Sequence, residues 1–140
     1  MAKPTVEDRI GIEDLFTRYT TALDAGDAEG VVACFTDDGW LDSPIVGRHQ
    51  GHAALRAFAE LTARPIRERG ARFRHVVSNF RIDMGAGRAR ARCYLLDYVT
   101  IDGKTELLSP GEYDCEVVKI GDDWRFASRE VRMDRTFTIP

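Results

Sequence analysis

Four polar residues of chemically reactive types lie where a protein core needs apolar side chains. Tyr19 and Asp24 fall near the end of an amphipathic first helix. His75 lies in the middle of a predicted strand, and Arg129 alternates with apolar residues in the last predicted strand. Polar groups are costly to bury unless something pairs with them. Their positions therefore indicate a pocket that runs through the fold, and function is to be sought there.

These residue types form a set that could abstract a proton beside a carbonyl group. A carboxylate such as Asp24 that accepts the Nδ1–H of His75 would fix the ring's tautomer and leave Nε2 as a base. Tyr19 and Arg129 are donors that could stabilise an oxyanion or assist a leaving oxygen. Each residue also has a purely structural interpretation. These are an acid in a helix-ending turn, a core histidine, a core tyrosine with its hydroxyl outward, and a solvent-facing arginine.

The bulk composition is that of one ordinary globular domain, and we predict a single domain over residues 1–140 with residues 1–4 disordered. The chain is 44% hydrophobic and 31% charged, with a net charge of −3, and this length allows a real hydrophobic core. The three cysteines are odd in number and embedded in apolar stretches, which indicates buried free thiols in a reducing compartment. No apolar run approaches the ~20 residues of a membrane helix. We therefore predict a cytoplasmic protein without a membrane partner.

The middle of the chain is rich in arginine. Nine arginines and two acids lie between Arg64 and Arg92, and Arg88, Arg90 and Arg92 share one face of a predicted strand. A nucleic-acid-binding face usually interleaves stacking aromatics with its charges, and here only Tyr94 follows. We therefore interpret this face as solvated or subunit-facing, and we predict no nucleic-acid partner.

Three helices are expected before the period of the apolar residues changes. Thr5 and Gly26 delimit the first helix, and Asp27 caps a short second one. Residues 35–39 read as a turn, 40–42 as a brief strand and 43–51 as a loop. A third helix starts near His52 and is ended or kinked at Pro65. The two histidines of 49–52 lack a third nearby ligand, so we predict no metal site there.

Long strands with a period of two follow Gly70. They are expected at 73–84, 88–101, 105–119 and 124–136, with Asp102-Gly103 forming a tight hairpin. The apolar phase slips by one residue near Ser78-Asn79, which is typical of a β-bulge. Helices followed by a meander of antiparallel strands predict an α+β fold. Because a bent sheet around a helix encloses a cone, we expect a cavity between the first helix and the sheet.

Several segments together resemble the SnoaL-like branch of the nuclear transport factor 2-like superfamily, over nearly the whole chain. They are Ile12-Glu13-Asp14-Leu15-Phe16, Leu23-Asp24-Ala25-Gly26-Asp27, Phe35-Thr36-Asp37-Asp38-Gly39, Arg74-His75 and Trp124-Arg125-Phe126. The resemblance implies a cone of curved, mostly antiparallel sheet wrapped around N-terminal helices. Relatives assemble as dimers or trimers, so it also implies a homodimer or homotrimer. It leaves the reaction open, since this scaffold serves isomerases, cyclases, dehydratases, oxygenase subunits and binding modules.

Within that superfamily the site pattern is similar to the cofactor-free dehydratases: scytalone dehydratase, bile-acid dehydratase and lindane dehydrochlorinase. The resemblance places Asp24 and His75 at their helix–strand dyad, and it places Tyr19 and Arg129 at the tyrosine and late-strand arginine of the bile-acid enzyme. The dehydrochlorinase has lysine at the place of Tyr19, which disfavours dechlorination. Steroid isomerase is the alternative enzyme, but its base is an aspartate before proline, and here Ser43 precedes Pro44.

The resulting hypothesis is a cofactor-independent lyase that removes water from a small hydrophobic cyclic carbonyl compound, such as a polyketide or steroid. His75 is the expected general base, oriented by Asp24. Tyr19 and Arg129 are expected to bind the carbonyl oxygen or to protonate the departing hydroxyl. The candidate walls of the substrate pocket are Trp40, Phe73, Asn79 and Tyr113. The alternative is a module without catalysis, which binds a small molecule or serves a ring-hydroxylating oxygenase as accessory subunit.

Overall fold

A computed structural model describes residues 2–140 and places three helices before a long run of strands. The helices are α1 (Val6–Ala25), α2 (Ala28–Val32) and α3 (His52–Arg69). The strands are β1 (Phe35–Ser43), β2 (Gly47–Gln50), β3 (Arg72–Met84), β4 (Arg88–Ile101), β5 (Lys104–Ile120) and β6 (Asp123–Met133).

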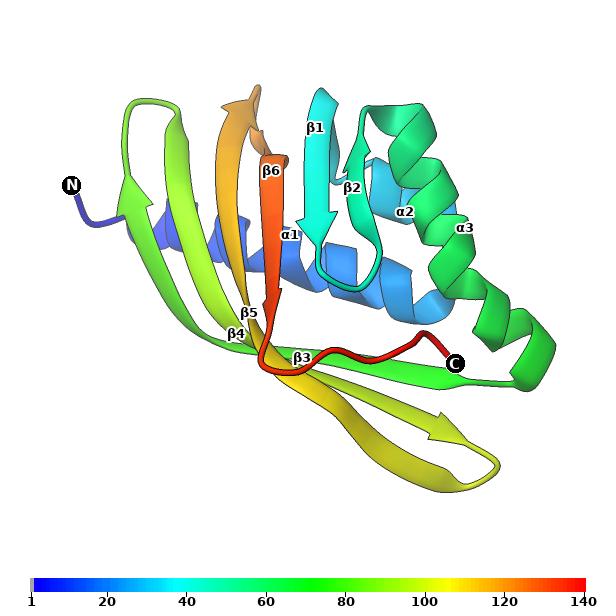
Figure 1. Ribbon diagram of the computed structural model, residues 1–140. Coiled ribbons are helices and arrows are strands. Elements are labelled where there is room, and N and C mark those ends of the chain that lie inside the picture. Colours follow the sequence, from blue (N-terminus) through cyan, green and yellow to red (C-terminus); the bar gives the residue numbers. More distant parts are fainter. Residues whose placement is uncertain (1) are drawn as a thin grey trace.

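All six strands belong to one sheet in the order β2-β1-β6-β5-β4-β3. Neighbouring strands are antiparallel except β1 and β6, which pair in parallel. Figure 1 shows that β3, β4 and β5 bend strongly, that α1 runs along one face of the sheet, and that α2 and α3 lie at the β2 end. This arrangement confirms the predicted α+β fold with a curved, mostly antiparallel sheet around N-terminal helices.

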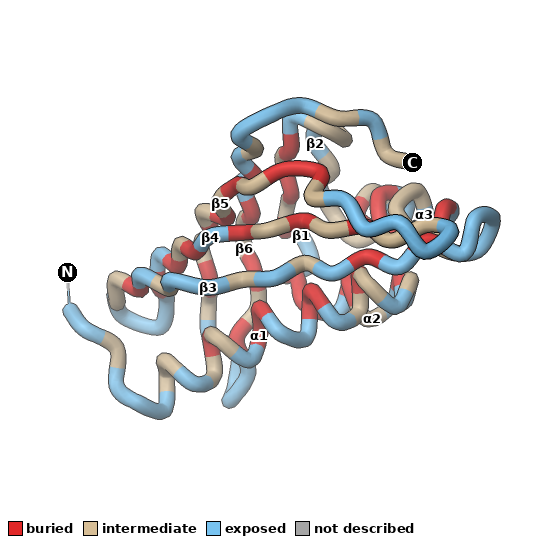
Figure 2. The backbone as a smooth tube through the Cα atoms, turned by 90° about the horizontal axis from the view of Figure 1, so that it is seen from below, coloured by how far each residue is buried: buried red, intermediate tan, exposed pale blue. Residues whose placement is uncertain are grey.

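The first helix is set by its caps and by one apolar stripe. The Thr5 side chain accepts a hydrogen bond from the Asp8 amide at 3.1 Å, and Gly26 ends the helix in the left-handed conformation, with φ 71°. The stripe packs against the concave face of the sheet, and Figure 2 shows burial concentrated between these two layers. Its buried members are Ile12, Leu15, Phe16, Tyr19, Thr20 and Leu23.

A β-bulge interrupts β3 where the sequence predicts it. The register between β3 and β4 shifts between Ser78 and Arg81, and Asn79 adopts a left-handed conformation with φ 58°. Asparagine tolerates this conformation better than most residues with a side chain. The extra residue reverses which side chains of β3 face the core. Ile82 is buried on one side of the bulge and Phe73 on the other.

Several predicted boundaries are wrong. Residues 35–39 are not a turn but the first half of β1, and the predicted loop at 43–51 contains the short strand β2. The first error arises because β1 has an irregular register with β6 between Phe35 and Trp40, which breaks its alternation. The last strand ends at Met133 rather than Thr136, and the remaining residues form a tail without regular structure.

Pro65 does not end the third helix, since α3 continues to Arg69 with Pro65 buried inside it. At the start of the chain, Ala2 exchanges two backbone hydrogen bonds with Met84 at the end of β3. Of the predicted disordered start, Met1 lies outside the described residues. No helix within residues 2–140 is long and apolar enough to cross a membrane.

Candidate active site

A cavity lies between α1, α3 and the concave face of the sheet, as the bent sheet predicts. Its polar wall contains Tyr19, His75, Asp97 and Tyr113, and the rest of its lining is mainly apolar, with Leu23, Phe58 and Phe73 among the contributors. The cavity measures about 70 Å³, which is room for several water molecules.

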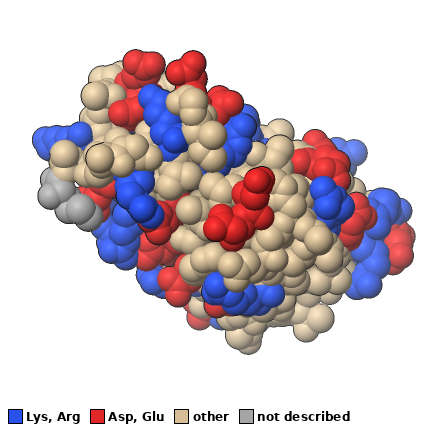
Figure 3. Space-filling model, turned by 90° about the horizontal axis from the view of Figure 1, so that it is seen from above, with Lys and Arg blue, Asp and Glu red and all other residues tan. Residues whose placement is uncertain are grey.

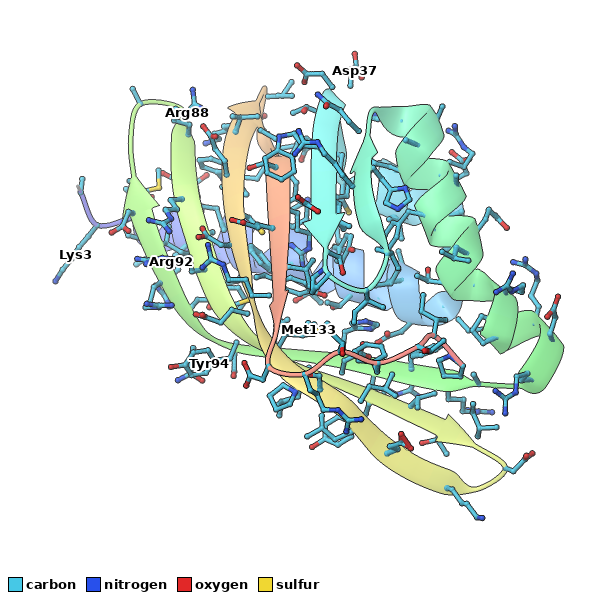
Figure 4. All side chains as sticks on the ribbon, in the orientation of Figure 1. Lys3, Asp37, Arg88, Arg92, Tyr94 and Met133 are labelled. Carbon is cyan, nitrogen blue, oxygen red and sulfur yellow. The ribbon has the colours of Figure 1, made fainter. Side chains whose placement is uncertain are left out.

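The tail after β6 forms one wall of this cavity. Phe137, Ile139 and Pro140 line it. Figure 4 labels Met133, where β6 ends and the tail turns across the lower part of the sheet toward α3. The tail is held at its start by two hydrogen bonds, from the Asp134 amide to the Pro110 carbonyl at 2.9 Å and from the Arg135 amide to the Ser109 hydroxyl at 3.1 Å. Beyond Arg135 it is a cavity wall without regular secondary structure.

Asp24 and His75 meet across 51 residues of sequence. The Asp24 carboxylate lies 2.5 Å from His75 Nδ1 through Oδ1 and accepts the His75 backbone amide at 3.0 Å through Oδ2. The side chains are 16% and 11% exposed, so this contact is largely shielded from water. The two bonds fix both the ring and the strand to the end of α1. With Nδ1 engaged, Nε2 is the ring nitrogen left to face the cavity.

Asp97 of β4 faces that second nitrogen. Its Oδ1 lies 3.4 Å from His75 Nε2, and the residue is 5% exposed. His75 and Asp97 are opposite one another in the β3–β4 ladder. The histidine is therefore placed between two carboxyl groups, one on each ring nitrogen.

The two flanking carboxyl groups change the acid–base behaviour of His75. Burial by itself lowers the pKa of the imidazole, but the hydrogen bond to Asp24 and the negative charges of Asp97 and Asp24 outweigh it, and the net pKa is raised. Burial also raises the pKa of Asp97; the positive charge of His75 opposes this shift and the negative charge of Asp24 adds to it. Nε2 and Asp97 thus hold a proton more firmly than either group would in water.

Arg129 is fully buried, so the structure resolves its ambiguous strand phase as inward. Its guanidinium carbon lies 3.5 Å from the ring centre of Tyr113, 4.0 Å from that of Tyr19 and 4.4 Å from that of Phe126. Nη1 donates to Cys115 Sγ at 3.3 Å, while Nε and Nη2 have no hydrogen-bond partner among residues 2–140. Arg129 is not among the residues that line the cavity; it lies behind them, in contact with two of its tyrosines.

Arg129 contacts Tyr19 and Tyr113, which line the cavity, so its positive charge acts on two groups of the cavity wall. Burial raises the pKa of Tyr19 and of Tyr113 well above that of free tyrosine, and the nearby guanidinium charge opposes this only in part. Both phenols therefore remain protonated and can donate hydrogen bonds. The sequence grouped Tyr19 with Arg129 as donors, but the structure puts Tyr19 and Tyr113 at the cavity and Arg129 one layer away.

Two of the four predicted pocket walls lie elsewhere. Phe73 and Tyr113 line the cavity. Trp40 does not, because β1 directs it to the opposite face of the sheet, where the Arg48 guanidinium carbon lies 4.1 Å from its ring centre. Asn79 is exposed and forms the β-bulge, so its role is in shaping β3 and not in lining the cavity.

The family model of the SnoaL-like domain matches residues 4–130. The chain belongs to the SnoaL-like domain family. Among solved structures it is similar to an aspartate-to-asparagine variant of Rv3472, a protein of unknown function from Mycobacterium tuberculosis, with 28% identity and a TM-score of 0.83 over 91% of this chain and 77% of that one. A candidate scytalone dehydratase from Novosphingobium aromaticivorans shares 23% identity, with a TM-score of 0.78 and coverage of 91% and 85%. ActVI-ORFA of Streptomyces coelicolor shares 21% identity, with a TM-score of 0.79 and coverage of 90% and 96%.

Asp97 is the site residue of this SnoaL-like domain that sequence reasoning missed, although a signal was present. Cys93, Leu95, Asp97 and Val99 form one buried alternation along β4, so a carboxyl group occupies an inward position. In the β3–β4 hairpin, the numbers of two residues that lie opposite one another add up to 173 near the turn at Ala86, as for Met84 and Ala89. On the far side of the bulge these numbers add up to 172, so Asp97 lies opposite His75.

Proposed function

We propose that this SnoaL-like protein is a cofactor-independent, dehydratase-type lyase that acts on a small hydrophobic cyclic carbonyl compound such as a polyketide or steroid. The observation that carries the proposal is the shielded contact between the Asp24 carboxylate and His75 Nδ1 at the wall of a mainly apolar cavity. A module that only binds apolar molecules has no need of a charged dyad, whose burial is costly.

The base in this mechanism is His75 Nε2. Nδ1–H donates a hydrogen bond to Asp24, which keeps the lone pair on Nε2, and the charge of Asp24 stabilises the imidazolium that forms. The raised pKa of His75 makes it a stronger base than a free imidazole. Positioned acid–base catalysis of this kind contributes ~10²–10⁴-fold to the rate. The substrate proton removed would be the one on the carbon next to the carbonyl, which is acidified by that group.

The carbonyl oxygen would be held by the phenols of Tyr19 and Tyr113. Both are protonated and belong to the cavity wall, and both touch the buried guanidinium of Arg129. Negative charge that develops on the substrate oxygen would thus meet two donors backed by a fixed positive charge. Donors aimed at developing charge in a site that excludes water are among the largest contributors to catalysis.

The comparisons support a small-molecule-processing enzyme fold for this chain, and one structural neighbour is named as a candidate scytalone dehydratase. The isomerase alternative lacks its expected base, because Ser43, and not a carboxylate, occupies that position at the cavity. The binding-module and oxygenase-subunit alternatives predict that substitution of His75 leaves function unchanged.

Self-association as a homodimer or homotrimer remains part of the proposal. The sheet face opposite α1 carries Arg88, Arg90 and Arg92, of which Arg88 and Arg92 are labelled in Figure 4. Acidic residues pair with these arginines within the chain, as Asp114 does with Arg90 at 2.7 Å. A sheet face with such paired charges can meet a second copy with little charge repulsion. On the side of the molecule seen from above, Figure 3 also shows acidic and basic side chains beside one another.

The test of the proposed function measures proton abstraction on its own. Wild-type protein should catalyse exchange of the hydrogens next to the carbonyl of 1-tetralone for deuterium in D₂O, followed by NMR. His75→Gln should keep the circular dichroism spectrum of the fold and lose at least ~100-fold of this rate. His52→Gln, at the start of α3 and outside the cavity lining, is the matched control and should keep it. Equal rates in wild type and His75→Gln would refute the proposed role.

A further inference from the structure

The mechanism above leaves one buried reactive group without a task, the carboxyl group of Asp97. It lies on the inward face of β4, lines the cavity and is 5% exposed. Its Oδ1 lies 3.4 Å from His75 Nε2 but has no hydrogen-bond partner among residues 2–140. Buried polar atoms without a partner are rare in folded proteins and call for an explanation.

While His75 is neutral, a carboxylic acid explains this placement better than a carboxylate does; the negative charge of Asp97 that raises the pKa of His75 is present once Asp97 has given up its proton. A carboxylate needs partners for its oxygen atoms, and an ionised Asp97 would add a second negative charge beside Asp24. A protonated Asp97 instead has an O–H group, and the unprotonated Nε2 of His75 is the acceptor facing it. Burial, which raises the pKa of Asp97, acts in the same direction.

We propose that Asp97 is a second catalytic residue, a neutral carboxylic acid that protonates the departing hydroxyl group and exchanges its proton with His75 Nε2. This inference rests on the proposed lyase function and deepens it, since it predicts a substrate that carries a hydroxyl group within reach of the pair. The substrate class would thus be a cyclic ketone with its hydroxyl group one carbon beyond the carbon that loses the proton.

The step balances without any other reactant. His75 Nε2 takes the proton from the carbon next to the carbonyl, and the electrons of that C–H bond become the new C=C bond. The C–O bond to the hydroxyl group breaks with its electrons on oxygen, and Asp97 gives that oxygen a proton, so water leaves. The proton on Nε2 then passes to the Asp97 carboxylate, and both groups return to their starting state.

The other donors near the cavity are less suited to this task. The phenols of Tyr19 and Tyr113 have raised pKa values, which makes them weaker acids than free tyrosine. Arg129 is not part of the cavity lining. A carboxylic acid is the strongest acid available at this wall, and it lies beside the base that can restore its proton.

The first experiment separates the two halves of the reaction with two probes. 1-Tetralone has an exchangeable hydrogen next to its carbonyl but no leaving group, whereas 3-hydroxy-1-tetralone can lose water to give 1-naphthol. In Asp97→Asn we expect dehydration of the hydroxylated probe to fall at least ~100-fold, with deuterium exchange into 1-tetralone kept within about tenfold of wild type. Asp83→Asn, which removes a carboxylate paired with Arg92, is the control and should leave both rates unchanged.

The second experiment needs no substrate and reads the shared proton directly. With ¹⁵N-labelled histidine, His75 should show two titration steps in wild type, one of them above the ordinary histidine pKa of about 6.5. In Asp97→Asn only the lower step should remain, because the shared proton is gone. Four other titratable or charged groups surround the pair and are unchanged by the substitution: Asp24 and Tyr19 from α1, Tyr113 from β5 and Arg129 from β6.

The outcomes distinguish this inference from the function on which it rests. Wild-type dehydration with no loss in Asp97→Asn, or a His75 titration that the substitution does not change, would overturn the role of Asp97 and leave the Asp24–His75 base in place. If His75→Gln loses both exchange and dehydration whereas Asp97→Asn loses only dehydration, the role of His75 as general base is supported. A wild type that exchanges no hydrogen of 1-tetralone contradicts the proposed function, and the titration then still decides whether Asp97 shares a proton.

Discussion

Arg129 illustrates how a single residue can serve the site at a cost to the fold. A buried guanidinium without a carboxylate is expensive, because it loses its hydration and gains no ion pair. Contacts with aromatic faces return part of that cost, since a cation within ~6 Å of a ring centre is attracted by its π-electrons. Tyr19 and Tyr113 provide the shortest of these contacts. The remaining cost is consistent with a residue kept for the charge that it places behind the cavity's phenols.

Replacing Arg129 by methionine should therefore separate stability from activity. We expect Arg129→Met to keep or raise the free energy of unfolding, by up to ~1–4 kcal/mol, because an apolar chain of similar length suits this environment better. The rate of deuterium exchange into 1-tetralone should fall ~10-fold or more, since the phenols lose their supporting charge. Urea unfolding and NMR exchange measure the two quantities. A loss of more than ~3 kcal/mol in stability would show that Arg129 is mainly structural.

At the scale of elements, the bulge in β3 determines which residues form the site. If Asn79 were an ordinary paired residue of β3 and not a bulge residue, His75 would turn to the outer face, because side chains alternate along a strand. His75 would also lie opposite Tyr98 instead of Asp97, by the register sums on the two sides of the bulge. Because residue 79 is accommodated as a bulge, His75 stays within reach of both Asp24 and Asp97.

The left-handed conformation of Asn79 is the property on which this bulge depends. Asn79→Val should destabilise the fold by ~1–2 kcal/mol, because a β-branched residue is disfavoured at φ 58°. Asn79→Gly, which accepts that conformation, should remain within ~0.5 kcal/mol of wild type. Urea unfolding compares the two variants, whose exposed side chains make few other contacts. Equal stability of the valine variant and wild type would contradict the importance assigned to the bulge.

At the scale of the whole molecule, the order of the elements was predictable from the sequence because the apolar period is regular in α1, β4 and β5. The phase slip of the apolar residues at Ser78-Asn79 was visible in the sequence too, and the bent sheet and the cavity were predicted from it. The dyad of Asp24 and His75 was predicted from residue type and family resemblance, and the structure brings the two side chains into contact. The fold was thus predicted mainly from the regular period of the apolar residues, and the site mainly from polar residues at positions expected to be apolar.

The rest depended on packing between segments that are distant in sequence. The parallel pairing of β1 with β6 determines which way Trp40 points, and β1 alone has no clear alternation. The phase of Arg129 is ambiguous locally, since both faces of β6 carry apolar residues; the aromatic side chains from α1 and β5 decide it. The contact of Asp97 with His75 depends on the register of the β3–β4 hairpin beyond the bulge. To predict it, both the hairpin register and the position of the bulge have to be correct.

The most direct test of the central claim is a crystal structure of the protein with 1-tetralone bound. We expect the ring to occupy the cavity, with the carbon next to the carbonyl within about 3.5 Å of His75 Nε2. The carbonyl oxygen should accept a hydrogen bond from Tyr19 or Tyr113, and Asp24 should remain bonded to Nδ1. A ketone bound in this cavity with its reactive carbon turned away from Nε2, or a His75 ring detached from Asp24, would contradict that claim.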